Sequence, residues 1–296
     1  GNVVDPQETI REYGADILRI WAASSDYSDD LRIGKEIIGS SVDAYRKLRN
    51  TIRYLLGALD GYTQAQALPV AEMPELERYV LHLVADLDDD VRAGYEKFDF
   101  KGVWRAVFDF CALDLSAFYL DIRKDSLYCD RPDAIRRRAA RTVMHILYER
   151  IVRWLAPVCV FTMEEAFLAR PRGDGASVHL ELFPEKGAWE DEKLAAKWEA
   201  LRDIRRVVTG ALELERREKR IGASLEAAPT LYIETGAHMS ALDGVDLADV
   251  FISATVTVKT ETAPAGAFRL PDVAGVAVVP AVTDAEKCVR CWRHTE

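Results

Sequence analysis

The sequence contains no long hydrophobic run. None of its apolar stretches approaches the roughly 18 residues that a membrane-spanning helix needs, and its first residues, "GNVV", show no signal-peptide pattern. We therefore expect a cytoplasmic protein with no membrane partner. Because the sequence also begins without a methionine, we expect a fragment of a longer protein.

Cysteine is scarce as well, with five in 296 residues. Cys111, Cys129 and Cys159 stand singly among apolar neighbours, which favours reduced core thiols over a disulfide framework. Cys288 and Cys291 have the CxxC spacing of zinc ligands in "EKCVRCWRHTE". Because a structural zinc needs four ligands, the pair predicts a half site, to which His294 is a candidate third ligand.

Known catalytic motifs are missing too. There is no glycine-rich phosphate loop with its lysine, no nucleophile elbow and no HExxH pair, and none of the five histidines stands at metal-ligand spacing from another. The acidic run "DLDDD" at residues 86–90 is interpreted as a solvated helix face. The residues themselves thus indicate no catalytic centre.

What is present is mostly amphipathic helix. "DPQETIREYG" predicts a helix capped by Asp5, with Pro6 at its first position and Gly14 in the left-handed conformation after its end. A capping box of Thr162 and Glu165 predicts another helix start. Further helices are predicted near residues 15–23, 34–61, 74–96, 101–123, 133–156 and 190–220.

Their spacing predicts a fold that is mainly α, an antiparallel helix bundle over residues 34–183, with Trp104, Phe108, Phe118 and Trp154 buried. After it, β-branched alternating stretches predict a small mixed α/β domain in the C-terminal part. These stretches are residues 228–235, 247–261 and 273–282.

The net charge of −10 argues against nonspecific coating of nucleic acid, but local basic faces can still bind phosphate. Arginines and one asparagine project together from one predicted helix face, opposite its leucines, at i, i+3, i+4 and i+7. They are Arg46, Arg49, Asn50 and Arg53. Arg136, Arg137, Arg138 and Arg141 open another helix, and Arg216, Arg217, Lys219 and Arg220 crowd the end of a third. A solvated surface with a few ion pairs is the more ordinary explanation of the first cluster, and the helix dipole is a sufficient explanation of the last. Arginine forks nonetheless match RNA phosphates.

Several longer stretches resemble a known family, the class I aminoacyl-tRNA synthetases and, among these, the isoleucyl-tRNA synthetases. The opening "GNVVDPQETIREYGADILRIWAASSDYSDDLRI" is similar to the segment that follows the KMSKS loop. "AYRKLRNTIRYLLGAL", "LSAFYLDIRKDSLYC", "LAPVCVFTMEEAF", "SVHLELFP", "IGASLEA" and "KCVRCW" resemble the isoleucine enzymes. The resemblance covers nearly the whole chain and is weakest at residues 230–285.

The resemblance implies a tRNA-binding C-terminal part with five segments. They are a stem-contact segment at 1–33, the helical anticodon-binding domain at 34–185, a connecting helix at 186–222, a small α/β domain at 223–285 and the truncated start of a zinc module at 286–296. Lys124, inside one matching stretch, joins Arg46, Arg49, Asn50, Arg53, Arg136, Arg137, Arg216, Arg217 and Lys219 as candidate tRNA contacts.

For the parent enzyme, the resemblance implies a monomer that ligates isoleucine to tRNA with ATP and magnesium and binds no DNA. The catalytic and editing domains would lie outside this chain, leaving the fragment inactive alone. Ile10, Ile17, Leu18 and Trp21 would then form an apolar patch facing the absent catalytic domain. Three alternatives remain open: the same region of a valyl- or leucyl-tRNA synthetase, a helical protein-interaction module without RNA binding, or a complete enzyme with an unrecognised site.

Overall fold

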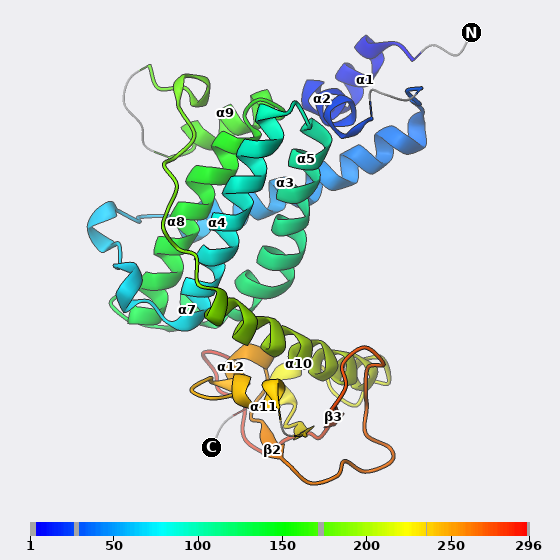
Figure 1. Cartoon of the computed structure of the whole chain (residues 1–296), viewed down its shortest axis with the longest axis vertical. Coiled ribbons are helices and arrows are strands. Elements are labelled where there is room, and N and C mark those ends of the chain that lie inside the picture. Colours follow the sequence, from blue (N-terminus) through cyan, green and yellow to red (C-terminus); the bar gives the residue numbers. More distant parts are fainter. Residues whose placement is uncertain (1–3, 27–29, 171–174, 235, 295–296) are drawn as a thin grey trace. The chain divides into compact units, whose positions relative to one another are not determined.

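Helices dominate the structure, a computed structural model that describes residues 4–26, 30–170, 175–234 and 236–294 (Figure 1). Residue contacts divide the chain into two units. Unit 1 comprises Gly1–Arg123 and Arg131–Glu190, and unit 2 comprises Lys124–Asp130 and Asp191–Glu296. The mainly α class predicted from periodicity is confirmed.

Two short helices open unit 1, α1 (Pro6–Tyr13) and α2 (Ala15–Ser24). The predicted start is confirmed, because the Asp5 carboxylate accepts a hydrogen bond from the backbone N–H of Gln7 and Pro6 follows it. Gly14 has the positive φ of 91° that favours glycine, but its ψ of 159° is not left-handed helical. The expected left-handed cap is therefore wrong, and Gly14 instead turns the chain directly into α2.

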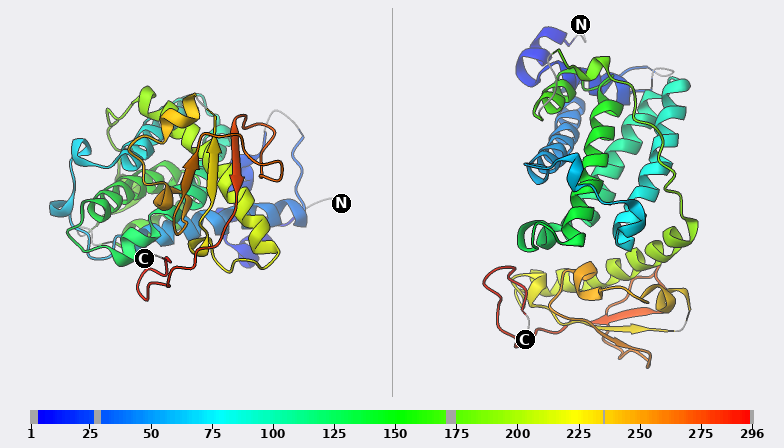
Figure 2. Two further views of the ribbon diagram at one scale, coloured as in Figure 1. Left: turned by 90° about the horizontal axis from the view of Figure 1, so that it is seen from below. Right: turned by 90° about the vertical axis from the view of Figure 1, so that its left-hand side faces the viewer.

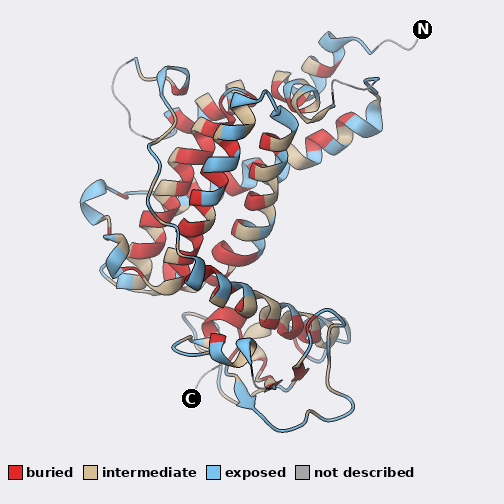
Figure 3. Cartoon of the chain, viewed as in Figure 1, coloured by how far each residue is buried: buried red, intermediate tan, exposed pale blue. Residues whose placement is uncertain are grey.

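The bundle consists of long helices that pack through their apolar faces, and its inner faces are buried (Figure 3). The helices are α3 (Lys35–Ala58), α4 (Glu75–Glu96), α5 (Phe100–Asp109), a π-helix (Phe110–Tyr119), α6 (Leu120–Ile122), α8 (Ile135–Leu155) and α9 (Val160–Leu168). Short 3-10 turns lie at Gln64–Gln66, Val70–Glu72 and Val178–Leu180. Trp104, Phe118 and Trp154 are buried as predicted, whereas Phe108 is only half-buried.

The start of α9 differs from the prediction. The helix begins at Val160, and the Thr162 side chain caps nothing. Instead the Asp16 carboxylate, from α2, accepts hydrogen bonds from the backbone N–H groups of Phe161 (3.3 Å) and Thr162 (2.8 Å) and from the Thr162 hydroxyl (2.6 Å). Helix α9 is therefore capped from a distant part of the sequence.

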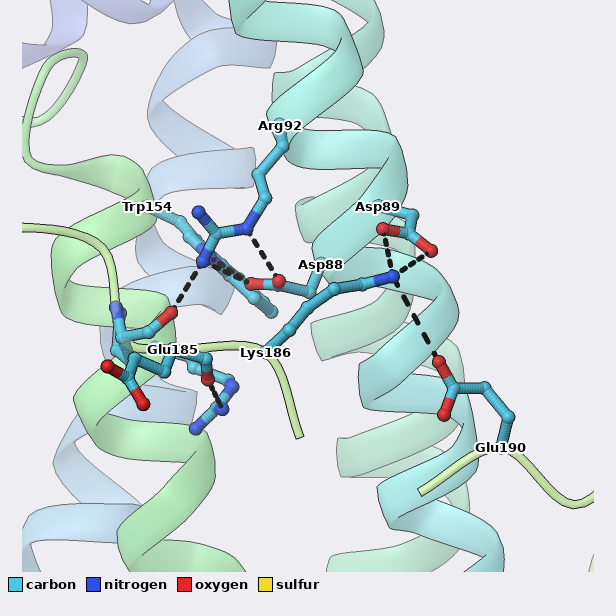
Figure 4. Close-up of polar contacts among 9 residues, drawn as sticks. Asp88, Asp89, Arg92, Trp154, Glu185, Lys186 and Glu190 are labelled. Atoms are coloured by element: carbon cyan, nitrogen blue, oxygen red, sulfur yellow. Dashed lines mark hydrogen bonds and ion pairs between the residues drawn. The ribbon is translucent and has the colours of Figure 1, made fainter. Parts of the chain in front are cut away.

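The acidic run at residues 86–90 also differs from its prediction, because not all of its side chains are solvated. Asp88 is 1% exposed, accepts a hydrogen bond from the Trp154 indole N–H at 3.2 Å, and pairs with Arg92 at 2.7 Å. Asp89 pairs with Lys186 across the surface. The interpretation of residues 86–90 as a solvated face is wrong at Asp88, because its side chain points between α4 and α8 (Figure 4).

Asp88, Asp89 and Arg92 also help to hold an extended segment, residues 181–190, which we name the strap. Arg92 donates to the carbonyl oxygen of Pro184, and Arg150 donates to that of Glu185 at 2.8 Å (Figure 4). The Arg150 guanidinium also lies 4.6 Å from the centre of the Trp189 ring. The strap thus crosses α4 and α8 with its backbone carbonyls hydrogen-bonded to arginines.

Unit 2 combines helices with a three-stranded sheet (Figure 2). Its elements are α7 (Lys124–Cys129), α10 (Glu192–Arg217), a 3-10 turn (Ser224–Glu226), β1 (Thr230–Ile233), α11 (Ala237–Ala241), α12 (Leu247–Phe251), β2 (Thr257–Lys259) and β3 (Val276–Val279). Central β1 pairs parallel with β2, placing Leu231 beside Val258, and antiparallel with β3, placing Leu231 beside Val278. Buried residues of α10 pack against β3.

The stretch 247–261, predicted to be extended, is a strand only at Thr257–Lys259. Its beginning is α12, capped by the Asp246 carboxylate, which accepts from the backbone N–H of Asp249. The prediction of an extended segment is therefore wrong at Leu247–Phe251, where Asp246 caps a helix.

The expected apolar patch on α1 and α2 is incomplete. Ile17 is 1% exposed and packs in a cluster with Ile38 and Val42 of α3, and Trp21 packs against that cluster. Ile10, Leu18 and Trp21 are half-buried. In the described part of the chain, no helix is long and apolar enough to cross a membrane.

Candidate nucleic-acid interface

One side of α3 carries the strongest candidate for binding phosphate. Leu48, Ile52 and Leu55 are buried on the side that faces the bundle. The opposite side is exposed and holds four of the predicted residues, Arg46, Arg49, Asn50 and Arg53. We name these four the α3 face. Periodicity predicted their common orientation, and the structure brings them together on one helix surface.

The arginines of the α3 face are only loosely held. Arg46 lies 3.6 Å from Asp43, and Arg49 lies 3.6 Å from Glu165 of α9, and both pairs are solvent-exposed. Such pairs contribute little and are easily exchanged for another anion. Arg53 makes no ion pair or hydrogen bond with any residue that the structure describes. Lys47, which the sequence analysis did not select, is exposed on the same helix and adds a further cation.

A hollow of about 200 Å³ lies beside this face, between α3 and α9. It is lined by Arg49, Ile52, Arg53, Leu56, Thr162, Glu165, Ala166 and Ala169. Two arginines stand at its edge, and small or aliphatic side chains make most of its floor. Sequence reasoning missed the hollow because it depends on two helices meeting.

The second cluster, at the start of α8, contains two arginines that hold backbone carbonyls. Arg138 donates to the carbonyl oxygens of Gln66 and Ala67, at 3.3 and 3.4 Å. Arg141 donates to the carbonyl oxygens of Ala58, at 3.0 Å, and Asp60, and burial lowers the pKa of its guanidinium. These two arginines hold the loop after α3, so they are structural. Arg136 and Arg137 are half-exposed on α8.

The third cluster, in unit 2, is exposed at the end of α10. Arg216 pairs with Glu213 at 2.7 Å. Arg220 forms hydrogen bonds with both oxygens of Glu215 and so lowers the pKa of that carboxyl. Arg217 and Lys219 are exposed there, as is Lys124 on α7. Local ion pairing and the helix dipole account for much of this cluster.

The two cysteines of the CxxC motif lie close together. The backbone amides of Cys291 and Arg290, and the Cys291 thiol, hydrogen-bond to Cys288 and lower the pKa of its thiol. His294 instead places Nδ1 2.8 Å from the carbonyl oxygen of Ala285. A third thiol, Cys129 of α7, was missed: its sulfur lies 3.7 Å from the carbonyl oxygen of Arg290.

These donors do not make a closed zinc site. Among the described residues, no three His, Cys, Asp or Glu side chains come together in a metal-binding arrangement. His294, the candidate third ligand, therefore does not join the cysteine pair, because its ring is directed to a backbone carbonyl. The structure shows two adjacent thiols that fit half of a tetrahedral thiolate site.

The class of fold is a helical bundle, with an arginine-rich exposed face on one helix. Comparison with known proteins places it in a family. Residues 77–231 match the family described as the anticodon-binding domain of tRNA ligase. This match spans more than half of the chain, which therefore belongs to that family.

Several curated proteins that match this chain along its whole length are isoleucine–tRNA ligases. The chain is 52% identical over all of its 296 residues to that of Brucella abortus biovar 1 (strain 9-941), and 51% identical to that of Agrobacterium fabrum (strain C58). It spans about 30% of the length of these curated relatives.

Among the solved structures that match, one can be compared over most of this chain. It is described as "Crystal structure of the ternary complex of Agrobacterium radiobacter K84 agnB2 LeuRS-tRNA-LeuAMS". The match has a TM-score of 0.47 and 16% identity, and it covers 80% of this chain and 23% of that chain.

Proposed function

We propose that this chain is the tRNA-binding part of an isoleucine–tRNA ligase and that it holds the anticodon arm of the isoleucine-accepting tRNA. The family match and the identity of about half along the whole length support the proposal. The observation that carries it is the α3 face, because three exposed arginines and an asparagine project from one helix surface with few strong partners.

The geometry of the α3 face suits an RNA backbone. Arg46 and Arg53 are seven positions apart, which corresponds to about 10 Å along a helix. Guanidinium groups can bind phosphate oxygens through two parallel hydrogen bonds. Such contacts position an RNA without reading its sequence. Arg136, Arg137, Lys124, Arg216, Arg217 and Lys219 are proposed as secondary contacts.

The parent protein would activate isoleucine with ATP and magnesium and transfer it to tRNA in the cytoplasm, acting as a monomer. This chain would contribute RNA binding and no chemistry. We expect no isoleucine-dependent exchange between ATP and pyrophosphate above background from this chain alone. Exchange activity would contradict this division of roles.

The test is binding of tRNA to the wild-type chain and to the triple variant Arg46→Ala, Arg49→Ala, Arg53→Ala. Each lost phosphate contact reduces the magnitude of the slope of log affinity against log salt by about 0.7–0.9, so the three lost contacts of the triple variant should reduce it by about 2.1–2.7. A matched control is Lys97→Ala, Lys101→Ala, Arg105→Ala, which removes three exposed cations from elsewhere in unit 1. The fold of both variants is checked by circular dichroism.

Specificity requires a second comparison, between isoleucine tRNA with its anticodon intact and the same tRNA with its anticodon altered. We expect the altered tRNA to bind more weakly.

If the triple arginine variant binds tRNA as tightly as the wild-type chain, the α3 face is an ordinary solvated surface. A chain with no preference for tRNA would instead fit a protein-interaction module.

We also propose that Cys288 and Cys291 give two thiolates to a zinc ion, as half of a four-ligand site. Their adjacency and the lowered pKa of Cys288 support this. A two-ligand site should bind zinc weakly, because affinity depends on the full ligand set. Metal analysis after dialysis against a weak chelator should therefore find little zinc in this chain, and stoichiometric zinc would contradict the half-site proposal.

A further inference from the structure

A cavity of about 310 Å³ lies at one end of the sheet in unit 2. Because β1 and β2 run parallel, their carboxyl ends meet at the same edge, and antiparallel β3 begins there. The cavity is lined by Glu234 and residues 260–263, which follow these carboxyl ends, and by part of the segment from Arg269 into β3. Ligands of open α/β sheets commonly bind outside the carboxyl ends of parallel strands. The cavity thus lies where such a sheet offers a ligand site.

Its size and its apolar lining select a small ligand with an aliphatic part. The volume of about 310 Å³ is at the lower end of the roughly 300–1,000 Å³ of ligand pockets. Four apolar residues that line the cavity are each no more than 4% exposed, and they form its floor. They are Ile233, Val273, Val276 and Ala277.

Two groups of opposite charge line the same cavity without pairing with each other. The Glu234 carboxylate makes no hydrogen bond or ion pair with any residue that the structure describes. Arg269 donates to the carbonyl oxygens of Ala267 (3.1 Å) and Ala263 (3.5 Å), and it pairs with no carboxylate in the described ranges. Both side chains belong to exposed residues, so a ligand can reach them.

The second carboxylate at the cavity, that of Glu261, is already paired. The ammonium group of Lys259 lies 2.9 Å from it. Glu234 is therefore the carboxylate that can receive a cationic group of a ligand. Thr260 and Thr262 also line the cavity, and their hydroxyl groups can donate or accept a hydrogen bond.

We propose that this cavity binds a free α-amino acid with a short aliphatic side chain. Glu234 would accept hydrogen bonds from the ammonium group, Arg269 would donate to the carboxylate, and the side chain would lie on the buried floor. A ligand with only one charge would leave Glu234 or Arg269 without its partner. The site belongs to unit 2 and goes beyond the proposed function, because it does not depend on RNA binding by the α3 face.

The experiment compares L-leucine with two analogues that each lack one charge. 3-Methylbutylamine lacks the carboxylate of leucine, and 4-methylpentanoic acid lacks its ammonium group. Binding to the whole chain is measured by NMR titration. L-Leucine should bind about tenfold more tightly than either analogue, since each analogue loses one charge-assisted contact. Glycine, which keeps both charges but cannot contact the apolar floor, should also bind more weakly than leucine.

Two variants assign the contacts. Glu234→Gln should weaken leucine about tenfold and leave 4-methylpentanoic acid unchanged, whereas Arg269→Gln should weaken leucine about tenfold and leave 3-methylbutylamine unchanged. The matched controls are Glu199→Gln and Lys193→Gln, which remove exposed charges of α10 that do not line the cavity. Both controls should bind leucine as the wild-type chain does, and circular dichroism checks the fold of all four variants.

Contrary outcomes are distinct. If 3-methylbutylamine binds as tightly as leucine, the cavity is a cation site and the amino-acid proposal fails. If both cavity variants bind leucine like the wild-type chain, or if leucine shows no saturable binding, the proposal fails as well. Binding of tRNA is measured in parallel and should be unchanged in both cavity variants, so a failure of the proposed function would be seen separately.

Discussion

At the scale of single residues, the cysteines occupy opposite chemical environments. Cys111 and Cys159 are buried among apolar side chains, and loss of solvent raises the pKa of both thiols, to about 12 for Cys111. Cys288 receives hydrogen bonds from backbone amides, which lower the pKa of its thiol. Since the thiolate is the reactive form, these pKa shifts predict opposite reactivities.

Cys288 should be alkylated by iodoacetamide much faster than Cys111 in the native protein stripped of metal. A lowered pKa increases the thiolate fraction near pH 7–8, and a raised pKa with burial decreases it and blocks access. Mass spectrometry of the labelled peptides measures the two rates. In denaturant the rates should converge, and equal native rates would contradict the environments described.

The buried ion pair of unit 1 gives a second prediction at this scale. Arg123, 4% exposed, holds both oxygens of fully buried Glu77, at 2.6 and 2.8 Å, and the Tyr119 hydroxyl also donates to Glu77. Removing one partner leaves a buried charge without compensation. Arg123→Ala should therefore lower the free energy of unfolding by roughly 3–5 kcal/mol.

Urea denaturation measures this loss. The control is Arg105→Ala, which breaks an exposed pair with Asp109 and should cost less than about 1 kcal/mol. Equal losses in the two variants would show that the Glu77 carboxylate is not dependent on Arg123.

At the scale of elements, the N-terminus of α9 is capped by a residue of another helix, α2. The Asp16 carboxylate takes up two of its first backbone N–H groups. Asp16→Ala should destabilise the protein by about 0.5–2 kcal/mol, the usual cost of losing a cap. Asp90→Ala, on the exposed side of α4, should change stability by less than about 0.5 kcal/mol. Thermal unfolding of the two variants distinguishes them, and equal midpoints would contradict the cap.

Helices of this protein could be predicted from sequence because their signal is local. Periodicity places Trp154 of α8 in the core and sets the buried side of α3 opposite the α3 face. Partners that come from elsewhere in the chain leave no local signal. The Asp16 cap of α9, the burial of Asp88 and the hollow beside Ala169 each depend on which helices meet. Thr162, which has the local form of a cap, serves as a donor to Asp16 instead.

The function of the arginines is subject to the same limit, because their partners come from other parts of the chain. Periodicity identified every member of the α3 face but could not separate it from Arg138 and Arg141, whose contacts are with backbone carbonyls. Composition alone cannot tell a guanidinium used for folding from one left for a ligand. Only the contacts decide.

At the scale of the whole molecule, net charge opposes nonspecific binding. The chain has 49 acidic and 39 basic side chains, for a net charge of −10. Its attraction to any polyanion must therefore come from local faces. We expect a hundredfold mass excess of random duplex DNA to displace less than half of bound tRNA, measured by filter binding. A strongly basic RNA-binding protein is the positive control, and complete displacement by DNA would show that phosphate attraction alone governs binding.

The contacts of α2 limit where this chain can be shortened. Besides the Asp16 cap, Arg19 donates to the carbonyl oxygens of Pro157 (2.7 Å) and Val158 (2.9 Å), so one helix holds both the corner between α8 and α9 and the first turn of α9. A cut before Gly34 would follow the boundary suggested by sequence, yet it would strip hydrogen-bond partners from a corner about 125 residues downstream. An expression fragment intended to keep the bundle intact should therefore start before α2, at or ahead of Gly14.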